Sequence, residues 1–282
     1  MWGLAVMVWP EMSIVTVRRG RRVWTSFLRL TPAAACSSRA TARAVNVVET
    51  DESTVVDSGV DLVLSQPVAG AVVLEFDPPG EAVLAAIPDR LPVVAAAGST
   101  RHATVPHVIM DDRAGAIAAT GHLLALGHRT VHHVAIPPMG VPAGRSVGWH
   151  DALEAAGVPI PPLVQADWEP SSGYAAGLVL ARDPEVTAVL CGNDELAFGV
   201  MRAFAESGLR VPEDVSVVGF DGHPLADLWS PPLTTVEQDF VELGRLSFGL
   251  LEDMLEGRPV ARSVTTMPRL IVRQSTGPRR DT

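Results

Sequence analysis

Two polar residues stand directly after apolar runs of the sequence, and their chemical types suit the recognition of a hydroxylated ligand. Asn193 follows residues 188–191 and Asp221 follows residues 215–220, two runs rich in Val and Leu. An amide can donate and accept hydrogen bonds, and a carboxylate can accept two hydroxyl protons. This pair would suit a sugar or a nucleoside if the fold brings the two side chains together.

The segment between these residues predicts the element that positions them. Its apolar residues recur at helical spacing, at positions 196, 197, 200, 201 and 204. Asn193 and Asp194 can cap the start of this helix, Gly208 its end, and Pro212 blocks its continuation. A helix that connects two strands of one sheet makes them parallel, so Asn193 and Asp221 should leave the sheet at the same carboxyl edge. Open α/β sheets bind ligands at that edge.

Strands and helices alternate along most of the chain, which predicts an α/β fold. Further strands are expected at residues 44–49, 70–76, 92–97, 105–110, 130–136 and 163–166, with two short strands on either side of Pro268. Further helices are expected at residues 53–66, 81–87, 113–126, 143–156, 171–182 and 241–256. Such alternation predicts parallel sheets flanked by helices on both faces, and two consecutive sets suggest two lobes.

Two consecutive segments of the sequence also resemble a known protein family. CGNDELAFGVMRAFAESGLRVPEDVSVVGFDG, followed by SPPLTTVEQDFVELG, closely resembles the effector-binding domain of the LacI/GalR family of bacterial transcription regulators. The resemblance implies a periplasmic-binding-protein-like clamshell, with a first lobe of residues 44–110 plus 241–267 and a second of residues 111–240 plus 268–276. It also implies a homodimer and a small-molecule effector of the sugar type that binds between the lobes.

The resemblance assigns six residues to the effector site, and most also have a simpler structural interpretation. Arg145, in the pattern Arg145-x-x-Gly148, matches the family's effector-binding arginine, although a lone helical arginine is usually a surface residue. Trp168 would stack on a sugar ring, or else cover the core as a loop tryptophan. Asn193 and Asp221 could serve only as a helix cap and a turn former.

The remaining two residues belong to the VEQDF segment, where the family's chain crosses between lobes. By resemblance, Gln238 hydrogen-bonds the effector and Phe240 packs against it, whereas simple hinge packing is the alternative for Phe240. The sequence departs from the family pattern after Asp221, where Gly222 and His223 replace a second acid that is often present. This departure bears on which ligand binds.

Composition narrows the functional class. The two cysteines, Cys36 and Cys191, have no metal-ligand spacing, and Cys191 lies in an apolar strand, so neither a disulfide framework nor a metal site is expected. GxSxG, HExxH and P-loop motifs are absent, and the pair His132 and His133 is only a weak metal signal, so we expect no enzyme and no cofactor. Neither a membrane-spanning run nor a secretory signal is visible, which favours the cytoplasm and argues against a membrane partner.

Residues 1–43 do not fit the family pattern. They carry seven arginines and the single acid Glu11, a charge of +6, against −16 for the rest of the chain. Only a short strand at residues 14–17 is suggested, and no window supplies a helix-turn-helix. We expect a truncated or frame-shifted start, with a genuine arginine-rich tail as the alternative. Operator DNA is then a partner only if a helix-turn-helix is supplied. At the other end, residues 277–282 are expected to be disordered.

The sequence leaves three functions in competition. The first is a LacI/GalR-type regulator whose effector changes its affinity for DNA, here apparently without its own DNA-binding head. The second is a stand-alone sugar-binding protein that works with a transporter. The third is an inactive remnant of a repressor that still binds effector and partner subunits.

Overall fold

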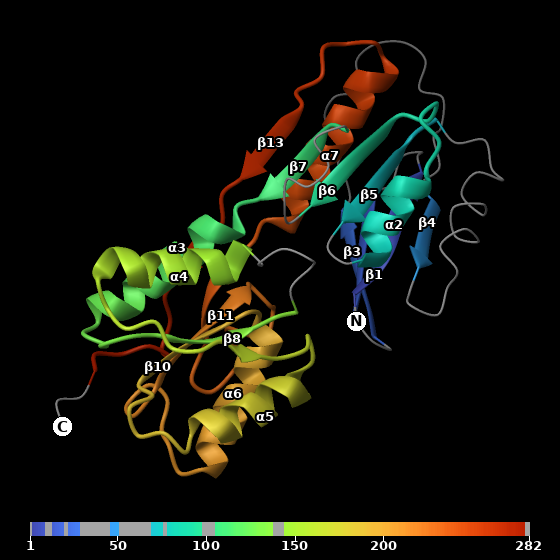
Figure 1. Ribbon diagram of the computed structural model, residues 1–282. Coiled ribbons are helices and arrows are strands. Elements are labelled where there is room, and N and C mark those ends of the chain that lie inside the picture. Colours follow the sequence, from blue (N-terminus) through green and yellow to red (C-terminus); the bar gives the residue numbers. More distant parts are fainter. Residues whose placement is uncertain are drawn as a thin grey trace. The chain divides into compact units, whose positions relative to one another are not determined.

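The computed structural model describes residues 2–8, 13–19, 22–28, 46–50, 69–75, 78–97, 105–137 and 144–279. The chain forms two compact units (Figure 1). The first unit comprises Met1–Met110 and Asp239–Thr266, and the second comprises Asp111–Gln238 and Met267–Thr282. Each unit combines parallel strands with helices, so the predicted α/β fold is confirmed.

The first unit contains a parallel core sheet with helices packed on it. Its parallel strands lie in the order β13, β7, β6 and β5, with bounds Ser263–Thr266, His107–Met110, Val93–Ala97 and Ala71–Glu75. The helices are α2 (Pro78–Ala86) and α7 (Phe240–Leu255). The apolar face of α7 packs on these strands through Leu243, Leu250 and Leu251, which form one cluster with Val94 and Val108.

The start of the chain differs from the prediction. Strands β1 (Trp2–Val8), β2 (Ser13–Arg19), β3 (Arg22–Leu28) and β4 (Asn46–Thr50) extend the same sheet, and all of their pairings are antiparallel. The sequence suggested only one short strand before residue 44. In β2 and β3 the clustered arginines hid the strand signal, although Val, Ile, Thr, Trp and Phe all have high β-propensity. The helix expected at residues 53–66 lies outside the described residues.

The second unit has a six-stranded sheet in the order β14, β12, β11, β10, β8, β9. The strands are β8 (His132–Ala135), β9 (Val164–Gln165), β10 (Ala188–Cys191), β11 (Ser216–Asp221), β12 (Thr234–Glu237) and β14 (Arg269–Ile271). All neighbours are parallel except β14, which runs antiparallel to β12 at the edge. The sequence analysis did not predict β12, because four residues between a proline turn and a helix start give little periodicity.

Helices cover both faces of this sheet, because alternate strand residues point to opposite sides. Val189 and Val217 pack in a cluster with α5 (Pro170–Leu180) and α6 (Asp194–Glu206). Leu190 and Val218 pack with α3 (Asp112–Ala125) and α4 (Gly144–Ala156) on the other face. The strands β10 and β11, which are mostly apolar, are thus buried on both sides, as expected for the centre of a parallel sheet.

The hydrogen-bonded structure of the second unit extends further toward the C-terminus than predicted, to residue 279. The Gly277 amide donates to Ser216 Oγ at 3.0 Å, and the Arg279 amide donates to the Leu126 carbonyl at 2.9 Å. These two hydrogen bonds hold residues 277–279, for which disorder was expected. Residues 280–282 lie outside the described residues.

Candidate functional site

Five of the six predicted site residues come from one edge of the second unit's sheet. Arg145, Trp168, Asn193, Asp221 and Gln238 follow or end β8, β9, β10, β11 and β12 respectively. Because these strands are parallel, their carboxyl ends meet at one edge of the sheet. The chain places β8 beside β10, with the helices that follow them, α4 and α6, on opposite faces. This is a topological switch point, the usual ligand site of open α/β sheets.

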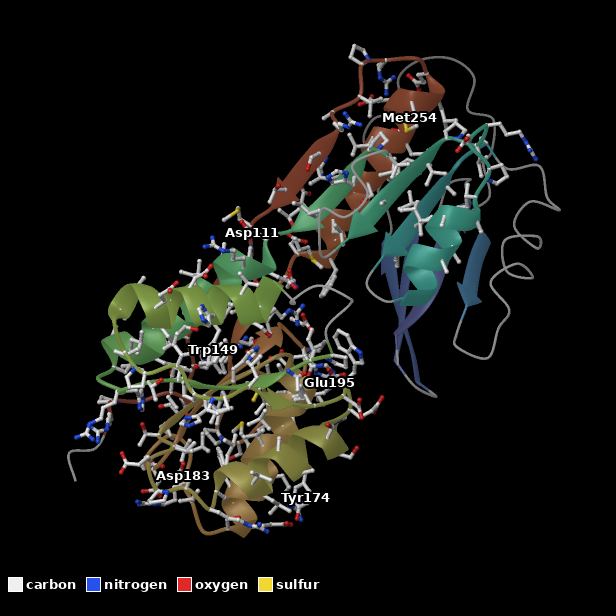
Figure 2. The ribbon with its side chains drawn as sticks, viewed as in Figure 1. Asp111, Trp149, Tyr174, Asp183, Glu195 and Met254 are labelled. Carbon is white, nitrogen blue, oxygen red and sulfur yellow. The ribbon has the colours of Figure 1, made fainter. Side chains whose placement is uncertain are left out.

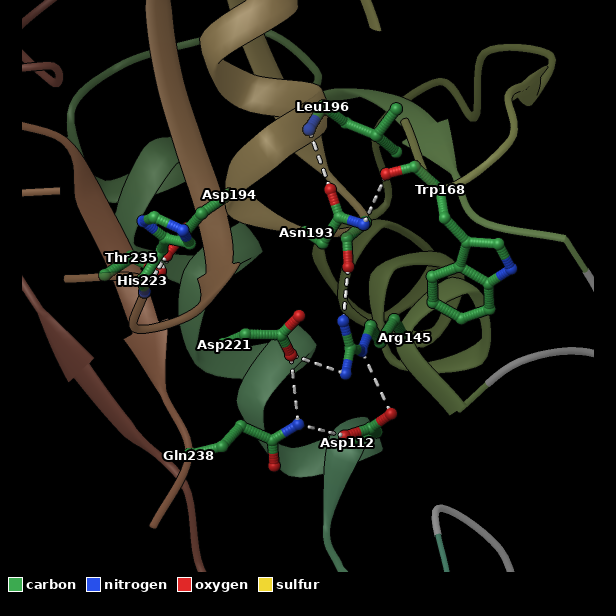
Figure 3. A network of polar contacts seen from close by, with 11 residues as sticks. Asp112, Arg145, Trp168, Asn193, Asp194, Leu196, Asp221, His223, Thr235 and Gln238 are labelled. Carbon is green, nitrogen blue, oxygen red and sulfur yellow. Dashed lines mark hydrogen bonds and ion pairs between the residues drawn. The ribbon is translucent and has the colours of Figure 1, made fainter. Parts of the chain in front are cut away.

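Arg145 is the centre of a buried polar network at this edge (Figure 3). Its Nε donates to Asp112 Oδ2 at 3.0 Å, and its Nη2 pairs with Asp221 Oδ1 at 2.8 Å. Its Nη1 donates to the Gly192 carbonyl, and the guanidinium carbon lies 4.0 Å from the centre of the Phe220 ring. Each nitrogen of the guanidinium therefore has a partner, and the alternative of an exposed surface arginine is wrong.

Close packing of two helices fixes the position of Arg145. A Cβ atom at Gly148 would lie 2.2 Å from the Arg113 carbonyl oxygen, so only glycine lets α4 approach α3 at this point. Trp149 points from α4 into the core, where its Nε1 donates to the Val131 carbonyl at 2.8 Å (Figure 2). In the Arg145-x-x-Gly148 pattern, the glycine thus allows the close helix packing that positions the guanidinium of the arginine.

Asp221 and Gln238 complete the network. Asp221 has a φ of 97°, an uncommon value for a residue other than glycine and one that is often found at functional sites. Gln238 Nε2 donates to Asp112 Oδ1 at 3.0 Å and lies 3.4 Å from Asp221 Oδ1. Gln238 Oε1 is buried and has no hydrogen-bond partner among the residues that the structure describes. The network therefore holds two carboxylates against one guanidinium and leaves a buried acceptor unsatisfied.

Asn193 supports the edge structurally. It is fully buried, its Oδ1 accepts from the Leu196 amide at 2.7 Å, and its Nδ2 donates to the Trp168 carbonyl at 3.3 Å. The first of these bonds is a helix N-cap, and the second ties the loop after β9 to the start of α6. The indole of Trp168 is half-buried and packs against the cluster of α5 and α6. The cap interpretation of Asn193 is confirmed, and a ligand role for either residue stays a prediction.

Phe240 is placed differently from the prediction. The sequence analysis assigned it to the second lobe, whereas it belongs to the first unit, where it begins α7 and packs against that unit's core. The three residues of VEQDF that follow β12 include the division between the units, which lies after Gln238. Sequence spacing alone could not separate two residues so close to the boundary.

Two acids near the site, Asp112 and Asp194, were not predicted as site residues from the sequence. Asp112 begins α3 directly after β7 and Asp111, so it also follows the carboxyl end of a strand, which was the available signal. Burial raises the pKa of the Asp112 carboxyl, and Arg145 partly opposes that shift. For Arg145 itself, burial acts to lower the pKa, but Asp112 and Asp221 outweigh it and raise the value. Arg145 is therefore permanently charged in this setting.

Asp194 is the second missed acid and has partners of its own (Figure 3). Its Oδ1 accepts from Thr235 Oγ1 at 2.6 Å, and its Oδ2 accepts from the His223 amide at 2.5 Å. A Cβ atom at position 219 would lie 2.0 Å from Asp194 Oδ1, so Gly219 makes room for the carboxylate. Burial raises the pKa of Asp194 to about 7, and the two hydrogen bonds oppose this shift. Asp194 thus joins α6 to β11 and β12.

The paired histidines are structural. His133 Nδ1 donates to the Leu190 carbonyl at 2.9 Å, so its Nε2 accepts from Ser146 Oγ at 3.1 Å. Burial lowers the pKa of His133 to about 4, and burial also lowers the pKa of His132. Within the described ranges, the group of acids and histidine close enough to hold a metal ion is His150, Asp151 and Glu154. That group lies at the surface of α4, and Asp151 is already paired with Arg113.

Comparison with known proteins agrees with this geometry. A family model described as a periplasmic binding protein-like domain matches residues 120–276, more than half of the chain. A dimeric Lac repressor with a C-terminal deletion and a K84L substitution has a similar structure, with a TM-score of 0.72 and 32% identity over 80% of this chain and 86% of that one. The chain belongs to the LacI/GalR family, in its effector-binding domain.

Other relatives of this family are described as regulators. A LacI-family regulatory protein from Chloroflexus aggregans superposes with a TM-score of 0.71 and 30% identity, covering 81% of this chain and 84% of that one. The HTH-type transcriptional repressor PurR of Salmonella typhi is 39% identical over 181 residues, which are 62% of this chain and 53% of the repressor. The chain thus spans about half the length of the curated relatives it matches. Among the described residues, no helix is long and apolar enough to cross a membrane.

Proposed function

We propose that this chain is the effector-binding part of a LacI/GalR-type transcription regulator, and that its effector is a small molecule of the sugar type bound by the Arg145 network. The observation that carries the proposal is the convergence of Asp112, Arg145, Asp221 and Gln238 in one buried network at the switch point of the sheet. Burying ionic groups costs free energy, and such groups cluster at functional sites, which favours a binding role over a purely structural one.

The relatives support the ligand class. A LacI-family transcriptional regulator from Enterococcus faecium was solved with bound ribose, with 31% identity and a TM-score of 0.60 over 66% of this chain and 71% of that one. A transcriptional regulator CelR was solved with cellobiose, with 32% identity and a TM-score of 0.68 over 78% of this chain and 69% of that one. Carboxylates such as those of Asp112 and Asp221 are suitable acceptors for sugar hydroxyl groups.

In this proposal the effector regulates by shifting a conformational equilibrium. A ligand changes DNA affinity only if it binds one conformation of the protein more tightly than another, and coupling of about 1–3 kcal/mol is typical. We further propose that the protein works as a homodimer in the cytoplasm and does not act as an enzyme. The dimeric Lac repressors among the structural neighbours support the dimer.

Calorimetric titration with ribose and with cellobiose tests the proposal. We expect at least one of these probes to bind saturably, and we expect Arg145→Ala and Asp221→Ala to weaken that binding at least about tenfold, a loss of about 1.4 kcal/mol. Asp151→Ala is the matched control, since it removes an acid from an ion pair on the surface of the same unit. Equal affinity in wild type, Arg145→Ala and Asp221→Ala would show that the ligand binds elsewhere.

A further inference from the structure

The last described residues of the chain contact the amino ends of β11 and β12, at the edge of the sheet opposite the candidate site. The Val217 amide donates to the Ser275 carbonyl at 2.8 Å, and Ser275 Oγ donates to the Val217 carbonyl at 2.6 Å. The Thr234 amide donates to the same Ser275 Oγ at 2.8 Å. One buried serine thus connects the starts of two neighbouring strands to the segment of residues 274–279, the C-terminal strap.

His128 contacts the strap and the sheet at once. Its Nε2 lies 3.2 Å from the Gly277 carbonyl oxygen of the strap and 3.2 Å from Ser216 Oγ at the start of β11. Its Nδ1 lies 3.0 Å from Thr187 Oγ1, just before β10. A carbonyl oxygen only accepts, so Nε2 carries the proton and Nδ1 accepts from the Thr187 hydroxyl group. The neutral ring, which is only 5% exposed, therefore has a partner at both nitrogens.

A second histidine contacts the strap from α3. His122 Nε2 lies 3.0 Å from Thr276 Oγ1 of the strap, and that hydroxyl group lies 3.1 Å from Thr234 Oγ1 at the start of β12. Both histidines therefore lie between the strap and the rest of the second unit. A change in the charge of either ring acts directly on the contacts of the strap.

A positive charge on these rings is disfavoured while the strap covers them. Burial lowers the pKa of His128, a hydrogen bond to the backbone of the strap partly opposes that shift, and Arg279 and His122 add to it. Burial also lowers the pKa of His122. Release of the strap would bring water to the rings and remove Arg279. Both rings therefore bind a proton more tightly when the strap is released than when it is docked.

The nearby acids on the loops before β10 and β11 have other partners. Glu185 lies 3.8 Å from Arg129 in an exposed ion pair, and Asp214 pairs with Arg210 at 2.8 Å. Each acid thus faces an arginine, and neither compensates a charge on His128. The charged groups that act on His128 are the strap's own Arg279 and the second histidine, and both oppose its protonation.

We infer that the C-terminal strap is a pH-sensitive device, which is docked on the amino edge of the sheet while His128 and His122 are neutral and is released when they take up protons. This inference goes beyond the proposed function, since it concerns the edge opposite the candidate site. Release would free the Val217 amide from Ser275. Because docking lowers the proton affinity of both rings, docking is strongest above about pH 6.5, the ordinary value for histidine, and weakens as the pH falls below it.

Amide hydrogen exchange of the full chain, measured by NMR at pH 5.0 and pH 7.5, tests the inference. Protection factors are corrected for the intrinsic exchange rate at each pH and compared between the strap contacts and β10, the central strand. We expect the amides of Val217, Gly277 and Arg279 to lose protection about tenfold at pH 5.0. The upper limit is about thirtyfold for each histidine whose pKa is 6.5 when the strap is released. The amides of β10 should lose less than about twofold.

Variants that do not titrate assign the effect to the two rings. Glutamine keeps an N–H group near the position of Nε2, so His128→Gln combined with His122→Gln should keep the strap docked at both pH values. We expect the change in protection between pH 7.5 and pH 5.0 to shrink to less than about twofold in this double variant. His150→Gln is the matched control, since it replaces a histidine on α4 whose side chain is 49% exposed, and it should keep the full change.

A titration of the histidine ring protons in the wild-type chain gives a measurement that needs no substitution. The loss of strap protection should follow the protonation of His128 or His122 with the same midpoint. Strap opening while both rings stay neutral overturns the inference, even if the glutamine variants release the strap by themselves. Equal protection at both pH values, an equal loss in β10, or a full change that persists in the double variant also overturns it.

Discussion

Arg145 holds together the polar edge of the second unit because, in the part of that unit that the structure describes, it is the one buried cation beside the acids Asp112 and Asp221. The side chains of Arg145, Asp112 and Asp221 are 8%, 13% and 12% exposed, so little water screens their interaction. Removing one partner of such a pair destabilises the protein by more than the net stabilisation that the intact pair provides, because the remaining charge is buried without compensation. The residue should therefore be important for folding as well as for binding.

Replacing Arg145 by methionine tests this expectation. Arg145→Met keeps the aliphatic stem but leaves two carboxylates uncompensated, so we expect the free energy of unfolding to fall by about 3 kcal/mol at pH 7.5. The loss should be smaller at pH 5, because burial raises the pKa of Asp112 and its carboxylate takes up a proton more readily as the pH falls. Urea denaturation of the variant and of Arg113→Met measures the difference. Arg113 is 56% exposed in its pair with Asp151, so its replacement should cost less than about 1 kcal/mol, and equal losses would contradict the account.

Asp194 makes the stability of the protein depend on pH in a defined direction. Its pKa is raised by burial from an ordinary 3.8 to about 7, so the folded state binds this proton more tightly than the unfolded chain does. The free energy of unfolding should then decrease as the pH rises from about 4 to about 7, by at most about 1.4 kcal/mol per pH unit for one proton.

Asp194→Asn removes this titration without removing the contacts. The asparagine oxygen can accept from the His223 amide, and its nitrogen can donate to Thr235 Oγ1. We expect the difference in unfolding free energy between pH 5 and pH 7.5 to be smaller in the variant by about 1–3 kcal/mol. Asp227→Asn, at an acid whose side chain is 69% exposed, controls for the change in net charge. An unchanged pH dependence in Asp194→Asn would refute this role.

At the scale of elements, the packing of α3 against α4 sets the position of the Arg145 guanidinium. The two helices approach so closely at Gly148 that a methyl group would collide with the backbone of Arg113. The effect of one added methyl group on the free energy of unfolding therefore depends on the position at which it is added. Gly121 offers a comparison within α3, because nothing lies within 4 Å of its added Cβ.

The two glycine substitutions should have opposite effects. Gly148→Ala should lower the free energy of unfolding by about 2 kcal/mol and weaken sugar binding, because α4 must move away from α3. Gly121→Ala should raise the free energy of unfolding by up to about 1 kcal/mol and leave binding unchanged, because alanine favours the helix and meets no neighbour. Thermal denaturation and calorimetric titration of both variants check this. A stabilised Gly148→Ala would contradict the packing argument.

The elements were largely readable from the sequence, and the site only in part. Helical spacing and capping residues identified α6 between β10 and β11, which was enough to place Asn193 and Asp221 at one edge. The strand β12 was too short to give a period, and the antiparallel strands β2 and β3 were obscured by the arginines at their ends and between them. Asp112 and Asp194 were missed because their significance arises from burial and from partners up to 126 residues away, which spacing along the chain does not reveal.

For the whole molecule, the account predicts that ligand binding and stability are linked. A sugar that binds the folded protein and not the unfolded chain should raise the free energy of unfolding by about 2.7 kcal/mol at a concentration one hundred times its Kd. Thermal unfolding with increasing ribose or cellobiose measures this, with Asp221→Ala as the variant in which the rise should be lost. A rise of equal size in Asp221→Ala would place the stabilising ligand away from the network.

The most direct test is a crystal structure of the protein with the sugar that binds most tightly in the titrations. The account predicts that one hydroxyl group of the sugar lies within hydrogen-bond distance of Gln238 Oε1 and that another donates to Asp221, while Arg145 keeps its contacts with both acids. A sugar bound away from this network, or a Gln238 oxygen that remains without a donor in the complex, would contradict the proposal that the Arg145 network binds the effector.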